Sequence, residues 1–201
     1  DEIEPRLFSF NSPHGACPGC DGLGTKFYFD PKLVAPDDGL SLRDGAIAPW
    51  ASASSRYYVQ TLDSLARHFK FSTVATFAEL SQPARDVILF GSGDEPVKMD
   101  YDDGIRSYSV TKPFEGVIPN LERRYRETDA HWLRDELSRF QSSQPCEACG
   151  GYRLKPETLC VKIAGLHIGE VTEMSISEAG AWFKGLAAKL TPKNREIAAR
   201  I

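Results

Sequence analysis

Two Cys-x-x-Cys steps constrain the fold of this chain more than any other feature of its sequence. The first step comprises Cys17 and Cys20, and the second comprises Cys146 and Cys149. A Cys-x-x-Cys step lets two thiolates hold one metal ion, and four sulfurs complete the tetrahedral ligand shell of a structural zinc. We therefore predict a structural Zn²⁺ ion held by Cys17, Cys20, Cys146 and Cys149, with residues 21–145 forming a loop between the two anchored ends.

Glycine residues follow both cysteine steps, at Gly22 and Gly24 and again at Gly150 and Gly151. A chain that turns back so that its amides face the sulfurs leaves little room for a side chain, which favours glycine. The alternatives are two disulfides or free buried thiols, and disulfides are disfavoured because no secretory signal is present. The sequence leaves open whether both steps share one ion or whether each also takes ligands from outside this chain.

The composition is that of an ordinary globular protein. Of 201 residues, 41% are hydrophobic and 26% are charged, and the net charge is −4. That charge argues against non-specific coating of nucleic acid but allows a local basic face. No apolar run approaches membrane-spanning length, so we expect no membrane partner. Five cysteines without export features indicate a reducing compartment and a cytoplasmic location.

The predicted elements indicate an α+β fold: a small mixed lobe of helices and a β-hairpin, rooted on a zinc-stapled, β-rich base with C-terminal helices. The expected parts are the N-terminal base (1–29), the lobe (30–143) and the returning base with its helices (144–201). We expect strands at 6–11, 26–29, 159–163 and 166–171, a hairpin at 97–110, and helices at 56–69, 83–90 and 120–140, from 175 and from 192.

Individual residues carry further expectations. Ser81 or Gln82 should cap the second helix and Gly91 should end it, while Asn120 should cap the third. Cys160 falls in a predicted apolar strand and should be a small buried thiol. His14 should be an exposed turn residue, and His167 a structural or exposed one.

The stretch from Arg106 to Arg126 is basic within an acidic chain, because it holds five basic residues against two glutamates. Such a contrast is how a local phosphate-binding face would look. The predicted DNA-binding residues are Lys98, Arg106, Lys112, Arg123, Arg124 and Arg126, and Tyr101, Tyr108 and Tyr125 could add stacking. The alternative is a solvated helix face, because Glu122 with Arg126 and Arg123 with Glu127 stand at ion-pair spacing.

Five separated strings of this sequence, in order, resemble the UvrA subunit of the bacterial excinuclease. They are EPRLFSFNSPHGACPGCDGLG, GAIAPW, FEGVIPNLERRYRET, PCEACGGYRLKPETL and GLHIGEVTEMSISEA. The resemblance implies the insertion domain of the first ATPase half, with flanking parts of its signature domain and with zinc at its root. It also implies an ABC-type ATPase that dimerises with a second UvrA, finds helix-distorting lesions in double-stranded DNA and delivers them to UvrB, in the bacterial cytoplasm.

The family's nucleotide-binding motifs are missing from this chain. The sequence has no G-x-x-x-x-G-K-[ST] loop and no LSGGE-type signature, so ATP is expected only in a longer parent protein, of which this chain would be a fragment. A further family Cys-x-x-Cys upstream of the first string is also absent, which leaves open which pairs share an ion. We therefore expect no enzymatic activity from these residues.

Three functions compete. The first is a DNA-contacting module of a damage-recognition ATPase, which binds duplex DNA by shape and phosphate contacts. The second is a structural or protein-docking zinc module without direct DNA contact. The third is a zinc deaminase, suggested by Pro145-Cys146-Glu147-Ala148-Cys149. That enzyme also needs a His-x-Glu motif, and His14, His68 and His131 are followed two places later by Ala, Lys and Leu.

Overall fold

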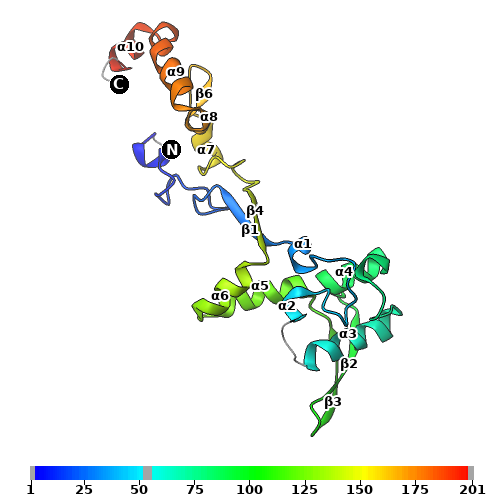
Figure 1. Ribbon diagram of the computed structural model, residues 1–201. Coiled ribbons are helices and arrows are strands. Elements are labelled where there is room, and N and C mark those ends of the chain that lie inside the picture. The colour runs from blue at the N-terminus through cyan, green and yellow to red at the C-terminus, as the bar shows by residue number, and fades with distance from the viewer. Residues whose placement is uncertain (1–2, 52–55, 199–201) are drawn as a thin grey trace. The chain divides into compact units, whose positions relative to one another are not determined.

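The chain divides into two compact units, Asp1–Phe27 with Ser143–Ile201 (the base) and Tyr28–Ser142 (the lobe). The computed structural model describes residues 3–51 and 56–198. Its strands form three two-stranded sheets among many short helices, which confirms the predicted α+β class (Figure 1). β1 (Thr25–Phe29) pairs with β4 (Gln141–Pro145), and the boundary between the units falls within both strands.

The lobe combines helices with one antiparallel hairpin. Its elements are α1 (Pro31–Val34), α2 (Ala48–Ala51), α3 (Arg56–Phe69), a 3₁₀ turn (Phe77–Glu79), α4 (Gln82–Phe90), β2 (Pro96–Asp102), β3 (Ser107–Pro113), α5 (Val117–Glu127) and α6 (His131–Ser138). The hairpin register pairs Val97 with Lys112 and Tyr101 with Tyr108. Side chains from almost every element meet in one core, whose most deeply buried members include Val34, Ile47, Leu65, Ile88, Val97, Met99, Val117 and Leu121.

Local capping signals place α4 where the sequence predicts it. The Ser81 hydroxyl accepts a hydrogen bond from the amide of Ala84, and the helix ends at Gly91, whose φ is 98°. Both devices satisfy backbone groups that a helix end leaves unpaired. α3 likewise spans the predicted residues.

The single helix predicted over 120–140 is wrong, because the structure has two helices there. α5 begins after Gly116, so Asn120 lies inside the helix and does not cap it. Thr128 and Ala130 are both extended, and the Thr128 hydroxyl accepts a hydrogen bond from the Ala130 amide at 3.2 Å. A threonine side chain that bonds the backbone two residues later competes with helix continuation.

Two glycines allow α4 and α5 to approach each other closely. Gly91 and Gly116 both have positive φ, of 98° and 92°, and a Cβ on Gly116 would lie 2.5 Å from the Gly91 nitrogen.

Gly116→Ala therefore adds backbone strain and a steric clash, and we expect it to lower the free energy of unfolding of the lobe by about 2–3 kcal/mol in urea titrations. Gly93→Ala is the control, since its φ is also positive but its Cβ would meet nothing within 4 Å. Equal losses for both variants would show that the close approach is unimportant.

The base consists of the cysteine region and a set of C-terminal helices. Its elements are a 3₁₀ turn (Pro5–Phe8), α7 (Pro156–Leu159), β5 (Lys162–Ile163), β6 (Leu166–His167), α8 (Ile168–Glu173), α9 (Ile176–Lys189) and α10 (Pro192–Ala198). α9 begins where the sequence predicts a helix, with Ser175 as its cap, and the ring of His167 caps α8, which confirms a structural role for that histidine. His14 is exposed, as predicted. None of the described helices is both long and apolar enough to cross a lipid bilayer.

Four expectations for the base are wrong. Residues 6–11 form a 3₁₀ turn and further turns in place of a strand, because Pro5 favours the first position of a helical turn. In the stretch 159–163, Pro156 starts α7, and only Lys162–Ile163 remains extended. Cys160 follows α7 and is exposed, not buried. The strand predicted over 166–171 is only two residues long before α8 begins.

Candidate metal centre and nucleic-acid interface

The four predicted cysteines converge in the base. The sulfurs of Cys17, Cys20, Cys146 and Cys149 all lie within 4.8 Å of one another, and all four residues are buried. The Cys20 and Cys149 sulfurs are 3.8 Å apart, which is too far for a disulfide. Four sulfurs at about 2.3 Å from a tetrahedral zinc would be separated by about 3.8 Å. The arrangement can therefore hold one shared metal ion.

The two cysteine steps are copies of one backbone turn. The amide of Cys20 donates to the carbonyl of Cys17, and that of Cys149 donates to Cys146, both at 3.3 Å. Each copy also bonds the other in the same way. The Cys17 amide donates to the carbonyl of Arg153, and the Cys146 amide donates to that of Gly24, both at 2.9 Å. The two cysteine steps thus make equivalent hydrogen bonds to each other, and each step places two sulfurs in the cluster.

The first cysteine step is followed by Gly24 and the second, at the equivalent position, by Arg153, yet both residues have a positive φ. Gly24 has φ of 80°, and its counterpart Arg153 has φ of 69°, which is unusual for a residue with a side chain. Arg153 compensates with two contacts: its Nε donates to the Gly22 carbonyl at 2.8 Å, and its guanidinium lies 3.6 Å above the Phe10 ring. Sequence reasoning missed this role, although the offset of Arg153 from Cys146, equal to that of Gly24 from Cys17, was a usable signal.

The donor set fits a soft divalent cation. Burial raises the pKa of the Cys149 thiol to about 11. Burial acts in the same sense on Cys146, but amide hydrogen bonds from Cys149 and Ala148 outweigh it and lower the pKa of that thiol to about 7. The Gly24 amide donates a hydrogen bond to the Cys20 sulfur at 3.2 Å. Four thiolates this close repel one another, and a bound cation removes that repulsion.

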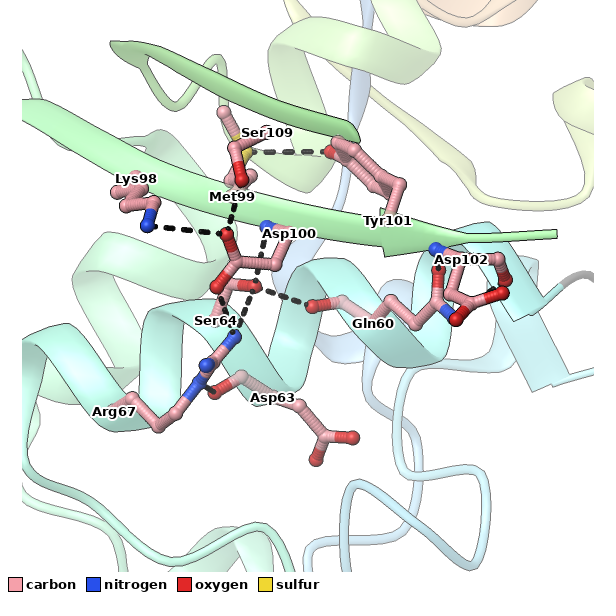
Figure 2. A network of polar contacts seen from close by, with 10 residues as sticks. All are labelled: Gln60, Asp63, Ser64, Arg67, Lys98, Met99, Asp100, Tyr101, Asp102 and Ser109. Carbon is pink, nitrogen blue, oxygen red and sulfur yellow. Dashed lines mark hydrogen bonds and ion pairs between the residues drawn. The ribbon is translucent and has the colours of Figure 1, made fainter. Parts of the chain in front are cut away.

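In the lobe, α3 fixes the inner strand of the hairpin along its open edge (Figure 2). The Gln60 amide group exchanges two hydrogen bonds with the backbone of Asp102, at 2.8 and 3.0 Å. The Ser64 hydroxyl accepts from the Asp100 amide, and Arg67 forms an ion pair with the Asp100 carboxylate at 3.1 Å. Side chains of α3 thus bond to the free edge of β2 in the place that a third strand would take.

The predicted DNA-binding residues do not share one face. Lys98 and Lys112 lie on opposite faces of the hairpin, because their register partners are Thr111 and Val97 and side chains alternate along a strand. Arg106 lies in the hairpin turn, and the side chains of all three are exposed. Arg124 and Arg126 come from α5, where Arg126 is exposed and Arg124 donates to the Tyr58 hydroxyl at 3.4 Å.

Arg123 is already engaged by two carboxylates. Its Nε and Nη2 donate to Glu115 at 2.8 and 3.1 Å, and its Nη1 donates to Glu127 at 3.1 Å. The Arg123 guanidinium is the main reason that the pKa of Glu115 is below its ordinary value of 4.5. The ion-pair alternative from the sequence therefore holds for Arg123 and Glu127.

Arg123→Ala is expected to lower the stability of the lobe without a comparable loss of DNA affinity. The pairs are half exposed and screened by solvent, so we expect about 0.5–1 kcal/mol at neutral pH. Because the folded-state pKa of Glu115 is lowered, its contribution is present above 4.5 and is lost as the pH falls through the lowered value. The stability difference from wild type should therefore shrink in acid. A DNA affinity loss larger than that of Arg126→Ala would contradict this assignment.

The tyrosines are arranged as a stack. Tyr101 is buried between Tyr57, parallel at 4.8 Å, and Tyr108 at 5.3 Å. Burial raises the pKa of Tyr101, whose hydroxyl lies 3.1 Å from that of Thr61. Tyr125 packs edge-on against Phe29 in the core. Only Tyr108 of the three predicted stacking residues is exposed, and Tyr57, which the sequence did not single out, is its exposed counterpart.

Fold and site together define a small α+β lobe whose flanking segments contribute to a four-cysteine cluster able to hold one metal ion. A family model described as the UvrA DNA-binding domain matches residues 30–139. The chain belongs to the UvrA DNA-binding domain family.

Curated relatives resemble the whole chain. UvrABC system protein A of Brucella abortus (strain 2308) is 59% identical over 200 residues, covering 100% of this chain, and that of Mesorhizobium japonicum is 58% identical over the same length. The chain spans only 20% and 21% of those two proteins. The crystal structure of UvrA2 from Deinococcus radiodurans matches with a TM-score of 0.67 and 24% identity, over 99% of this chain and 26% of that one. At that identity the match supports the fold alone.

Proposed function

We propose that this chain is the DNA-contacting insertion module of a nucleotide excision repair ATPase and that it binds duplex DNA by shape and phosphate contacts. The observation that carries the proposal is the family match over residues 30–139, which covers the lobe. The residues 30–143 would be the insertion, and the flanking segments would form its zinc-bearing root. No catalytic step is assigned to these residues.

Phosphate contacts are proposed first for the exposed cations whose side chains are not already engaged by another residue of the lobe. Arg106, Lys112 and Arg126 have exposed side chains, and no ion pair to them is formed within the described residues. Lys98 is 3.7 Å from Asp100, and Arg124 bonds Tyr58, so both would contribute less. Arg123 remains in the set, but its two carboxylates leave it the smallest expected effect. Such contacts position a protein on DNA without reading its sequence.

The metal is proposed to be Zn²⁺ in a structural role. A closed shell of four thiolates suits zinc and leaves no open position for water, so the ion would stabilise the base without taking part in chemistry. Metal analysis of the purified chain, with anomalous scattering at the zinc edge, should find one shared ion. Two ions, or a different metal, would refute this assignment.

The larger assembly is proposed from the relatives. The parent protein would bind ATP through motifs outside these residues, pair with a second copy of itself and deliver damaged duplex DNA to UvrB in the bacterial cytoplasm. The curated relatives are components of the UvrABC system, which supports this context.

A structural or protein-docking role is the second candidate, and one observation favours it. The contacts of Arg123 with Glu115 and Glu127 show that part of the basic stretch stabilises the lobe itself. Titration of the chain with a labelled duplex at low and at high salt separates the candidates. DNA contact predicts an affinity that falls steeply and linearly with salt on logarithmic axes. No measurable binding at low salt would leave the docking role.

A further inference from the structure

The tip of the β2–β3 hairpin holds an isoleucine out into solvent. Ile105 is 90% exposed and lies between Gly104 and Arg106 in the turn. An apolar side chain in this position adds nothing to the core of the lobe. Hairpin turns normally carry polar residues and glycine, so an exposed isoleucine in this turn indicates a role other than packing.

The turn is built to keep this side chain in place. One carboxylate oxygen of Asp103 accepts hydrogen bonds from the amides of Ile105 and Arg106, at 2.8 and 2.7 Å. Asp102 accepts from the amide of Gly104 at 2.7 Å and from the hydroxyl of Ser107 at 3.0 Å. The acidic residues at the tip therefore direct their carboxylates at the turn's own donors.

The strand behind the tip is held in place as well. Gln60 bonds both backbone groups of Asp102, the last residue of β2 (Figure 2). Tyr57 stacks on Tyr101 with ring centroids 4.8 Å apart. Figure 1 shows the hairpin extending beyond the helices of the lobe. Ile105 thus lies in a hydrogen-bonded turn at the end of a two-stranded hairpin whose inner strand is bonded to α3.

Cations flank the apolar tip. Arg106 follows Ile105 directly, and a guanidinium nitrogen of Arg56 lies 3.4 Å from the position that a Cβ on Gly104 would take. Exposed Tyr57 and Tyr108 lie further back on the same hairpin face as Tyr101. An exposed apolar side chain with arginines beside it is complementary to duplex DNA, in which an apolar stack of base pairs is bordered by negatively charged phosphates.

We propose that Ile105 is a wedge that enters a base step of duplex DNA, with Arg56 and Arg106 on the neighbouring phosphates. The inference rests on the proposed DNA-contacting function and deepens it. Apolar wedges such as isoleucine partly unstack a base step and kink the duplex, at a free-energy cost that depends on how easily the step deforms. Ile105 would therefore favour flexible pyrimidine–purine steps and distorted sites, which gives the module a physical means to test deformability.

The test uses the 201-residue chain and a duplex with a single central TA step, whose adenine is replaced by 2-aminopurine. Unstacking of this base raises its fluorescence, while anisotropy of an end label reports binding. We expect wild-type protein to raise the fluorescence and Ile105→Ala to abolish the rise. Ile105→Ala should also bind the duplex about tenfold more weakly, because part of the bend-dependent contact is lost. The salt dependence should not change, since no phosphate contact is removed.

Two controls sharpen the test. Ile105→Leu keeps an apolar wedge and should retain the fluorescence rise. Ile176→Ala removes an equally exposed isoleucine, 95% accessible, from the first residue of α9 in the base and should behave as wild type. On a duplex with a one-nucleotide bulge, where the step is already unstacked, the loss for Ile105→Ala should shrink.

The outcomes distinguish the wedge role of Ile105 from the DNA-contacting function of the chain. Binding by wild type without a fluorescence rise, or a rise that survives in Ile105→Ala, overturns the wedge and leaves the DNA-contacting function standing. Absence of any duplex binding at low salt overturns both. An Ile105→Ala variant that binds DNA normally but no longer binds a protein partner would assign the tip to protein docking and also overturn the wedge.

Discussion

Cys17→Ser is expected to release the metal and to unfold the cysteine region of the base. Cys17 is fully buried, and its hydroxyl replacement cannot supply the thiolate that completes the four-sulfur shell. Three buried thiols would then lose the cation that relieves their mutual repulsion. Binding of structural zinc contributes about 10–16 kcal/mol of apparent free energy in zinc-finger peptides, far more than other single contacts in the chain. Metal content measured by mass spectrometry should fall from one ion per chain to none.

The effect should be confined to the base. The cysteines form a buried cluster of their own, and the lobe has a separate core of apolar side chains. Hydrogen exchange should therefore show lost protection around residues 16–24 and 145–154, with protection kept in α3 and β2. Cys160→Ser is the matched control, because Cys160 is exposed and not part of the cluster, and it should keep the full metal content. Retention of the metal by Cys17→Ser would refute the proposed ligand set.

The features that the sequence predicted well rest on short-range signals. Cys-x-x-Cys spacing, followed by glycines, led to a cluster of four buried sulfurs. Ser81 begins α4 and Gly91 ends it, as the sequence predicted, because capping depends on residues that are neighbours in the sequence. The alternation of residues 97–101 likewise predicted a hairpin, and the structure buries Val97, Met99 and Tyr101 on one face of β2.

The errors arose where alternation or periodicity was followed without the contacts that decide whether an element forms. Residues 6–11 alternate as a strand would, but no strand among the described residues pairs with them, and the Leu7 carbonyl instead accepts a hydrogen bond from the Thr158 hydroxyl. The break between α5 and α6 depends on one threonine hydroxyl, which periodicity does not reveal. A pattern shows that an element is possible, whereas pairing decides whether it forms.

The basic stretch shows the same limit for function. A charge count treats Arg123 and Arg126 as equals, yet Glu115 and Glu127 hold the first and leave the second exposed. The predicted DNA-binding set also groups Lys98 with Lys112, although the hairpin register places them on opposite faces. Only the three-dimensional arrangement separates cations that stabilise the lobe from those available to a phosphate.

The double charge reversal Lys112→Glu with Arg126→Glu is expected to weaken duplex binding by about 100-fold at low salt. Each substitution removes a phosphate contact and adds a repulsive charge, and neither residue forms an ion pair within the described residues, so the fold should be preserved. The slope of log affinity against log salt should become shallower by about one for each lost contact. Anisotropy titrations over a series of salt concentrations measure both quantities, with circular dichroism as the check on folding.

A control with the same change in net charge separates local contact from overall repulsion. Lys184→Glu with Lys189→Glu changes two exposed lysines of α9 in the base and should leave the salt slope unchanged. If both double variants lose affinity equally, net charge and not the lobe's surface governs binding. If Lys112→Glu with Arg126→Glu binds DNA with wild-type affinity and slope, these side chains do not face the DNA. The basic stretch would then serve the protein itself, as the ion pairs of Arg123 already do.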